Sequence, residues 1–139
     1  MKTIVFYFGI IISSICILSC NSLVNSNKSV EEKFRTTIAE DGQTTYERYF
    51  AQLAGLRGEV KYKVFMPQGE LSPDVKVIQV DIDKKVNDAN YKTALLQYKF
   101  NVKTGFVDLV YIEINGKKAE NLITGMLDLG FMMMESVLE

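Results

Sequence analysis

The stretch Tyr91–Gly116, with the sequence YKTALLQYKFNVKTGFVDLVYIEING, decides the fold because its apolar and polar residues alternate at the period of a β-strand. Thr104-Gly105 interrupts the alternation, which predicts an antiparallel hairpin with strands over 91–103 and 106–115. Asn115-Gly116 is expected to turn the chain again. One face of this hairpin is expected to carry Ala94, Leu96, Tyr98, Phe100, Val102, Phe106, Val110, Ile112 and Ile114.

Two further alternating segments precede the hairpin, over residues 60–66 and 74–83. A loop rich in turn-forming residues separates them, and the polar loop 84–90 leads into the hairpin. Because these connections are short, we expect the four strands to form an antiparallel meander. The apolar positions of the two segments are Val60, Tyr62, Val64, Met66, Ile78, Val80 and Ile82.

Helical spacing of apolar residues appears before the strands. Val30, Phe34 and Ile38 recur every four residues, following a capping box that begins at Ser29. Gly42 is expected to end this first helix as a C-terminal cap. The segment therefore predicts a short amphipathic helix, and the residues that follow it predict a second.

The second helix is expected to start at a capping sequence at Thr44 and to end near Gly55 or Gly58. A third helix is expected over Glu120–Glu139, with a broad apolar arc that has Gly130 near its middle and leaves Met132 on the polar side. The side chains of the third helix expected to be buried against the sheet are Met126, Leu127, Met133, Met134 and Val137.

The predicted fold is an α+β domain with the element order α-α-β-β-β-β-α. We expect the two N-terminal helices on one face of the sheet and the C-terminal helix on the other face or along its edge. The second face of the sheet is not uniformly polar, so the last helix, a second copy of the chain or a ligand should cover it. Its predicted partner-binding residues are Phe65, Val77, Leu95, Leu109 and Tyr111.

The composition excludes several classes of function. The chain has no histidine and no tryptophan, and its two cysteines are Cys16 and Cys20. The usual zinc and copper sites and the histidine-dependent nucleophilic arrangements therefore lack their residues. With 16 basic and 17 acidic residues, the chain also lacks the positive charge typical of nucleic-acid binding. We assign no catalytic, cofactor-binding or metal-ligating residue.

The N-terminus has the layout of a bacterial secretion signal. Lys2 provides a positive charge, and the apolar run Ile4–Leu18 follows it. This run is shorter than the ~20 residues that a membrane-spanning helix needs. Ser19 and Cys20 then form a junction of a small residue with a cysteine.

The segment Ile17-Leu18-Ser19-Cys20 resembles the lipobox of bacterial lipoproteins, although the family favours leucine at the place of Ile17 and a small residue at that of Leu18. The resemblance implies that Cys20 receives a diacylglyceryl group and that a peptidase cleaves after Ser19. In this family an aspartate directly after the cysteine retains the protein at the inner membrane, and here that position is Asn21. The resemblance therefore implies an outer-membrane location in a host with two membranes, and a location at the cell membrane in a host with one. Residues 1–19 would then be the signal peptide, 20–28 a tether and 29–139 a single domain.

These observations favour a non-catalytic, lipid-anchored protein of the cell envelope, periplasmic or on the surface, that acts as a protein-binding or structural module. We expect the protein to be attached to the membrane through Cys20 and to bind a second protein of unknown identity. We do not expect it to bind nucleic acid, and it could form a homo-oligomer. One alternative is a carrier of small apolar ligands with a cavity between helices and sheet. Another is an enzyme that uses carboxylates alone, drawn from Glu59, Asp81, Asp108 and Glu113.

Replacing Cys20 with serine is expected to abolish lipidation and cleavage, because the acceptor thiol is lost. Metabolic labelling with a fatty-acid analogue measures this directly, and Cys16→Ser serves as the matched control that should label normally. Labelling that survives in Cys20→Ser, or that is lost in Cys16→Ser, would show that the lipidation site is misplaced.

Overall fold

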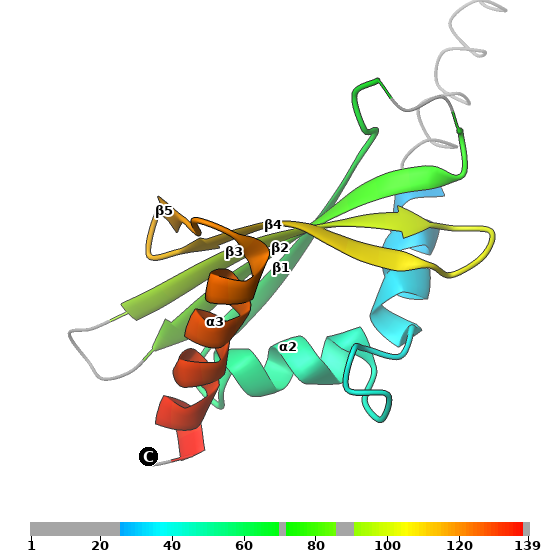
Figure 1. The fold of residues 1–139 in the computed structure, drawn as a ribbon. Helices are drawn as coiled ribbons and strands as arrows, with labels where there is room; N and C mark the ends of the chain where they lie inside the picture. Colours follow the sequence, from blue (N-terminus) through cyan, green and yellow to red (C-terminus); the bar gives the residue numbers. More distant parts are fainter. Residues whose placement is uncertain (1–25, 70–71, 86–90, 138–139) are drawn as a thin grey trace, which may run out of the picture. The chain divides into compact units, whose positions relative to one another are not determined.

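The computed structural model describes residues 26–69, 72–85 and 91–137 (Figure 1). The chain divides into two compact units, residues 1–30 and 31–139, and the second unit contains the sheet and the helices that pack on it. The helical segments are residues 26–36, α2 over Tyr46–Ala54 and α3 over Leu122–Val137. The strands are β1 (Glu59–Phe65), β2 (Val75–Lys85), β3 (Tyr91–Asn101), β4 (Val107–Ile114) and β5 (Lys117–Lys118).

The sheet is antiparallel throughout, with the strand order β1-β2-β3-β4-β5. The prediction of an α+β domain with an antiparallel meander and a C-terminal helix is therefore confirmed. The prediction of four strands is wrong, because β5 adds a fifth. Asn115 and Gly116 adopt φ angles of 50° and 75°, the paired positive values of a tight hairpin turn, and this turn brings β5 back against Glu113 and Ile114.

The starts and ends of the first two helices differ from the prediction. The first segment is already helical at residue 26, so Ser29 does not cap it, and it ends at residue 36, six residues before Gly42. Gly42 instead takes a φ of 68° in the loop to α2. The N-terminal cap of α2 is Thr45, whose hydroxyl accepts from the amide of Arg48. For α2 the cause is that the neighbouring residues Thr44 and Thr45 offer the same capping chemistry.

A bulge in β4 changes which of its side chains face the helices. Gln97 pairs with Tyr111, but Tyr98 pairs with Leu109, so Val110 is an extra residue in the strand. Leu109 therefore lies on the same face of the sheet as Tyr98, which is fully buried. The expectation that Phe106 and Val110 join this face is wrong, and they are 69% and 39% exposed.

Aromatic rings fill the layer between the sheet and the first two helical segments. The ring of Phe34 stacks on Tyr46 at a centroid distance of 4.7 Å and meets Tyr98 at 5.5 Å. Phe50 of α2 lies 6.0 Å from Tyr98, and Phe100 lies 5.6 Å from Phe34. Four of these rings have no exposed surface, so this face of β3 forms the centre of the core.

The C-terminal helix α3 packs on the same face of the sheet as α2, and the expectation that it covers the other face is wrong (Figure 1). A Cβ atom at Gly125 would lie 2.8 Å from Cδ1 of Ile112, so the helix and β4 approach closely there. The Nζ atom of Lys84 donates to the carbonyl of Met132 at 2.5 Å. Lys84 points to the same side of β2 as the buried Ile82, which places α3 on the core face.

The buried side of α3 is not the predicted one. Leu129 and Met132 are 1% and 3% exposed, whereas Leu127 and Met134 are 60% and 57% exposed. Met126 is half-buried, and the predicted side chains of Met133 and Val137 lie outside the described residues. Gly130 is exposed, and a Cβ atom at this position would have no neighbour within 4 Å, so its predicted place in the buried arc is also wrong. The cause is that α3 is apolar around most of its circumference, so periodicity alone selects no single side.

Within the described residues, no helix is both long and apolar enough to span a bilayer.

Replacing Tyr98 with phenylalanine is expected to raise the free energy of unfolding by about 1 kcal/mol, because the buried hydroxyl has no hydrogen-bond partner. The matched control is Tyr46→Phe in the same cluster, which loses the hydrogen bond to Glu40 and should lower that free energy by about 1 kcal/mol. Urea denaturation of the lipid-free chain beginning at Asn21, followed by circular dichroism, measures both. Equal effects of the two substitutions would contradict this account.

The same pair also reports on alkaline stability. Burial raises the pKa of Tyr98 and of Tyr46 above the ordinary value of 10.0. The contribution of each protonated phenol is therefore complete below pH 10 and is lost as the pH rises from there toward the higher pKa of the folded state. Above pH 10, Tyr98→Phe should lose less stability than the unmodified chain.

Candidate functional site

The face of the sheet opposite the helices carries no described helix, and we call it the open face (Figure 1). Its side chains alternate along each strand with the buried ones, and most are half-buried or exposed. The open face consists of Glu59, Lys61, Lys63, Phe65, Val75, Val77, Gln79, Asp81, Asp83, Lys85, Thr93, Leu95, Gln97, Lys99, Asn101, Asp108, Tyr111 and Glu113.

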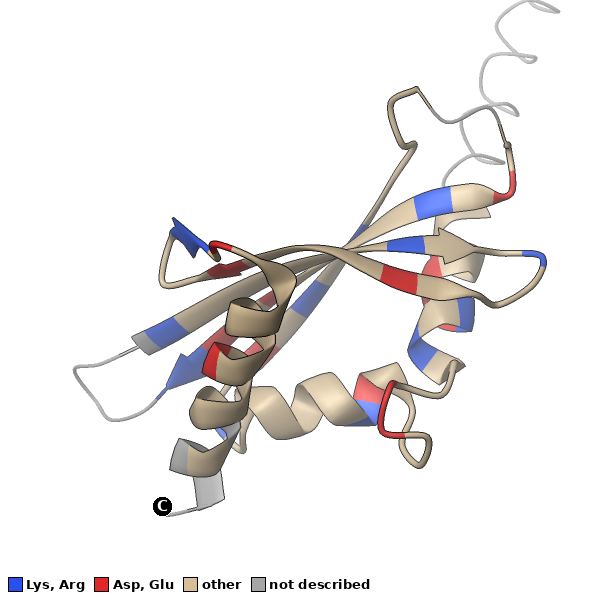
Figure 2. Ribbon diagram, viewed as in Figure 1, with Lys and Arg blue, Asp and Glu red and all other residues tan. Residues whose placement is uncertain are grey.

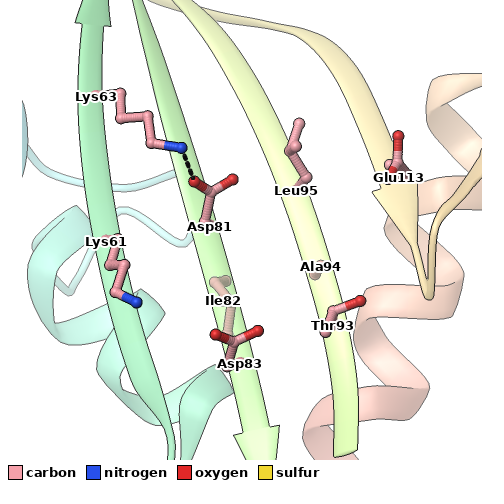
Figure 3. Close-up of a pocket in the computed structure, with 9 residues that line it drawn as sticks. All are labelled: Lys61, Lys63, Asp81, Ile82, Asp83, Thr93, Ala94, Leu95 and Glu113. Atoms are coloured by element: carbon pink, nitrogen blue, oxygen red, sulfur yellow. Dashed lines mark ion pairs between the residues drawn. The ribbon is translucent and has the colours of Figure 1, made fainter.

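A shallow hollow of about 350 Å³ lies at one end of the open face (Figure 3). Its side chains come from β1, β2, β3 and β4, and it is open to solvent. They are Lys61, Lys63, Asp81, Ile82, Asp83, Thr93, Ala94, Leu95 and Glu113. A smaller hollow of about 140 Å³ lies toward the other end, beside Val75, Lys99 and Asp108.

A chain of hydrogen bonds crosses three strands beside the larger hollow. The amide of Gln97 donates to the side-chain oxygen of Gln79, and the amide of Gln79 donates to Asp81, each at 2.9 Å. The ammonium group of Lys63 approaches the second oxygen of Asp81 at 2.9 Å (Figure 3). These four side chains are thus held in place before any partner arrives, which lowers the entropy lost on binding.

The signs of charge are mixed across the open face (Figure 2). Lys61 stands opposite Asp81 across the β1–β2 pair and Glu59 stands opposite Asp83. Glu113 lies on the far side of Leu95 (Figure 3). No group of three potential metal ligands occurs among the described residues. A surface with donors and acceptors side by side suits a ligand with both kinds of group, such as a polypeptide, better than a simple ion.

The register also separates two of the carboxylates named above as candidates for an enzyme, Asp81 and Glu113. Leu95 stands between Asp81 and Glu113, so these two residues are two strand spacings, or about 10 Å, apart. Glu113 accepts a hydrogen bond from the hydroxyl of Tyr111 at 2.9 Å, and this bond raises the pKa of the phenol. Asp81 and Glu113 therefore each hold a neighbouring donor and do not form a close acid–base pair with one another.

Four of the five predicted partner-binding residues lie on the open face. Phe65 and Val77 are direct cross-strand neighbours and form an apolar corner, in which Phe65 is 46% exposed. Leu95 and Tyr111 lie among polar side chains. Leu109 is on the opposite face because of the bulge, so its assignment to the partner-binding face is wrong. The predicted lipidation site, Cys20, lies outside the described residues.

The Gln97–Gln79–Asp81 chain was missed by sequence reasoning. Each of these residues stands at an outward position of a predicted strand, but only the pairing register shows that Gln79 faces Gln97. The pattern of alternation assigns each strand its faces without fixing the register between strands.

Comparison of the chain with family models, with curated proteins and with solved structures finds no match.

Replacing Leu109 with aspartate is expected to lower the free energy of unfolding by about 2 kcal/mol, because the bulge turns this position toward the core. Val110→Asp, one residue further along the same strand, is the matched control and should cost less than about 1 kcal/mol at its exposed position. Urea denaturation measures both. A larger loss for Val110→Asp would show that β4 has the regular register that the alternation predicts.

Proposed function

We propose that this chain is a non-catalytic, lipid-anchored protein of the cell envelope that binds another protein through its open face. The observation that carries the proposal is the placement of α2 and α3 on the same side of the sheet, which leaves the opposite side available. The lipobox-like segment ending at Cys20 supports the anchor and an extracytoplasmic location.

The chemistry of the open face favours a protein partner. It combines ordered amide and carboxylate groups around Gln79 with the apolar corner formed by Phe65 and Val77. The four strands, of 7, 11, 11 and 8 residues, present roughly 600 Å² at the usual strand spacing and rise. That area is about three quarters of the ~800 Å² per partner that a specific protein interface buries.

Other ligand classes fit the face less well. Nucleic acid would require an excess of positive charge, whereas acidic and basic side chains alternate here. A carrier of small apolar molecules encloses its ligand in a largely apolar cavity. In this domain the layer between helices and sheet is filled by buried rings such as Phe34 and Phe50, and the larger hollow is open and lined mainly by polar side chains.

The proposal is tested by reversing charge on the open face. Lys63→Glu breaks the contact with Asp81 and should reduce a protein partner recovered by crosslinking from native membranes about tenfold. Leu95→Arg, in the larger hollow, should act in the same direction. The control is Arg48→Glu, an exposed position on α2 on the other side of the sheet, which should leave recovery unchanged.

Thermal melting of each variant shows whether the fold is retained. If both open-face variants fold and recover the same partner as the unmodified chain, the open face is not the binding surface. If the purified chain releases a small apolar molecule on extraction and no protein depends on the open face, the carrier hypothesis replaces the proposal.

A further inference from the structure

Helix α3 is apolar on two opposite sides, and the sheet covers only one of them. At about 100° per residue, the buried residues Gly125, Leu129 and Met132 lie within one narrow arc. The opposite arc, which we call the outer stripe, consists of Ile123, Leu127, Gly130, Phe131 and Met134. Its four large side chains are 57% to 77% exposed.

Such a stripe is costly to leave in water. Surface helices normally turn one apolar side to the core and a polar side to solvent, and helices that are apolar all round are normally buried on all sides. Figure 2 shows the ribbon of α3 free of charged residues over most of its length. Asp128 is the one charged residue between positions 122 and 134, and it lies outside the arc of the stripe. The outer stripe is therefore a docking surface without charge.

The charge of this segment argues against a membrane as the occupant. Residues 120–139 contain four acidic residues and no basic one. Helices that lie on membrane surfaces carry lysine and arginine on their polar side, where these residues meet anionic lipids. An acidic helix would instead be repelled from such a surface.

The spacing within the outer stripe fits a second copy of the same helix. When two copies run antiparallel about a two-fold axis between Asp128 and Leu129, Leu127 of each copy stands opposite Gly130 of the other. Ile123 then meets Met134, and Phe131 lies at the flank of the seam. A Cβ at Gly130 would have no neighbour within 4 Å in its own chain, so the notch at this glycine is open. Leu127 thus meets an open notch, and Ile123 meets the flexible side chain of Met134.

We propose that the outer stripe is a self-association surface, through which two copies of this chain pair antiparallel across α3 with Leu127 seated against Gly130 of the other copy. Such an interface is isologous, so one patch serves both copies and the assembly closes as a dimer. The antiparallel arrangement also sets the two helix dipoles in opposition, which is favourable. The open face, on the other side of the sheet, stays available in this dimer.

The first test places the photo-crosslinking residue p-benzoyl-phenylalanine at Phe131 of the full chain, in cells that express two differently tagged copies. Irradiation should give an adduct of about twice the mass of one tagged copy that carries both tags. The same residue at Asp128, exposed on the same helix but outside the stripe, should give about fivefold less. An adduct with lipid alone, an adduct with a different protein alone, or no adduct would each overturn the proposal.

The second test uses the notch. Gly130→Ala should raise the melting temperature, because alanine favours the helix and its Cβ meets nothing in its own chain, yet it should lower the adduct yield. Gly130→Leu should lower the yield about tenfold. The exchanged double variant Leu127→Gly with Gly130→Leu again sets a large residue opposite a small one and should recover the yield.

Cooperative melting of each variant establishes that it is folded. If Gly130→Leu leaves the adduct unchanged, or if the folded double variant fails to recover it, the antiparallel pairing is wrong.

Discussion

The arrangement of the domain depends on the hydrogen bond from Lys84 to the carbonyl of Met132. Lys84 is 1% exposed, and its ammonium group would be costly to bury without a partner, so the strand that carries Lys84 and the helix that carries Met132 are held together. Because Lys84 is on the core side of β2, this bond places α3 on the same face as α2. The opposite face of the sheet is left open as a direct result. The close approach of Gly125 to Ile112 acts in the same direction. Together the two contacts choose which side of α3 meets the sheet, and they thereby determine which apolar side chains remain outside.

The strands could be predicted from the sequence because one face of the sheet is buried and the other is not. In β2 and β3 the predicted residues Ile78, Val80, Leu96 and Tyr98 are all fully buried. The alternation of apolar and polar residues along a strand shows directly which side chains face the core. It failed in β4, where Val110 adds one residue to the strand and reverses the facing of everything before it. A bulge cannot be recognised from the alternation of apolar and polar residues in one strand, because it is defined by the pairing with the neighbouring strand.

The helices show the opposite limit. The existence and approximate lengths of the helices follow from composition and from the spacing of apolar residues. The side of α3 that faces the sheet does not, because Leu127, on one side, is as apolar as Leu129 and Met132 on the other. The deciding contacts involve Lys84, a residue that sequence reasoning assigned to a polar loop. Of the candidate site, Phe65, Val77, Leu95 and Tyr111 could be placed on one face from alternation, while the hydrogen bonds around Gln79 require the register.

The bulge at Val110 has one more consequence, which concerns the rim of the sheet. Among the described residues, β5 pairs only with Glu113 and Ile114, and the amide of Ala119 donates to the carbonyl of Ile112, so the rest of this edge of β4 has no strand beside it. A regular strand in that position would be a template on which a neighbouring chain could add and an aggregate could grow. The extra residue breaks the even spacing of donors and acceptors and increases the local twist. This irregularity keeps the sheet of one molecule from extending into that of the next.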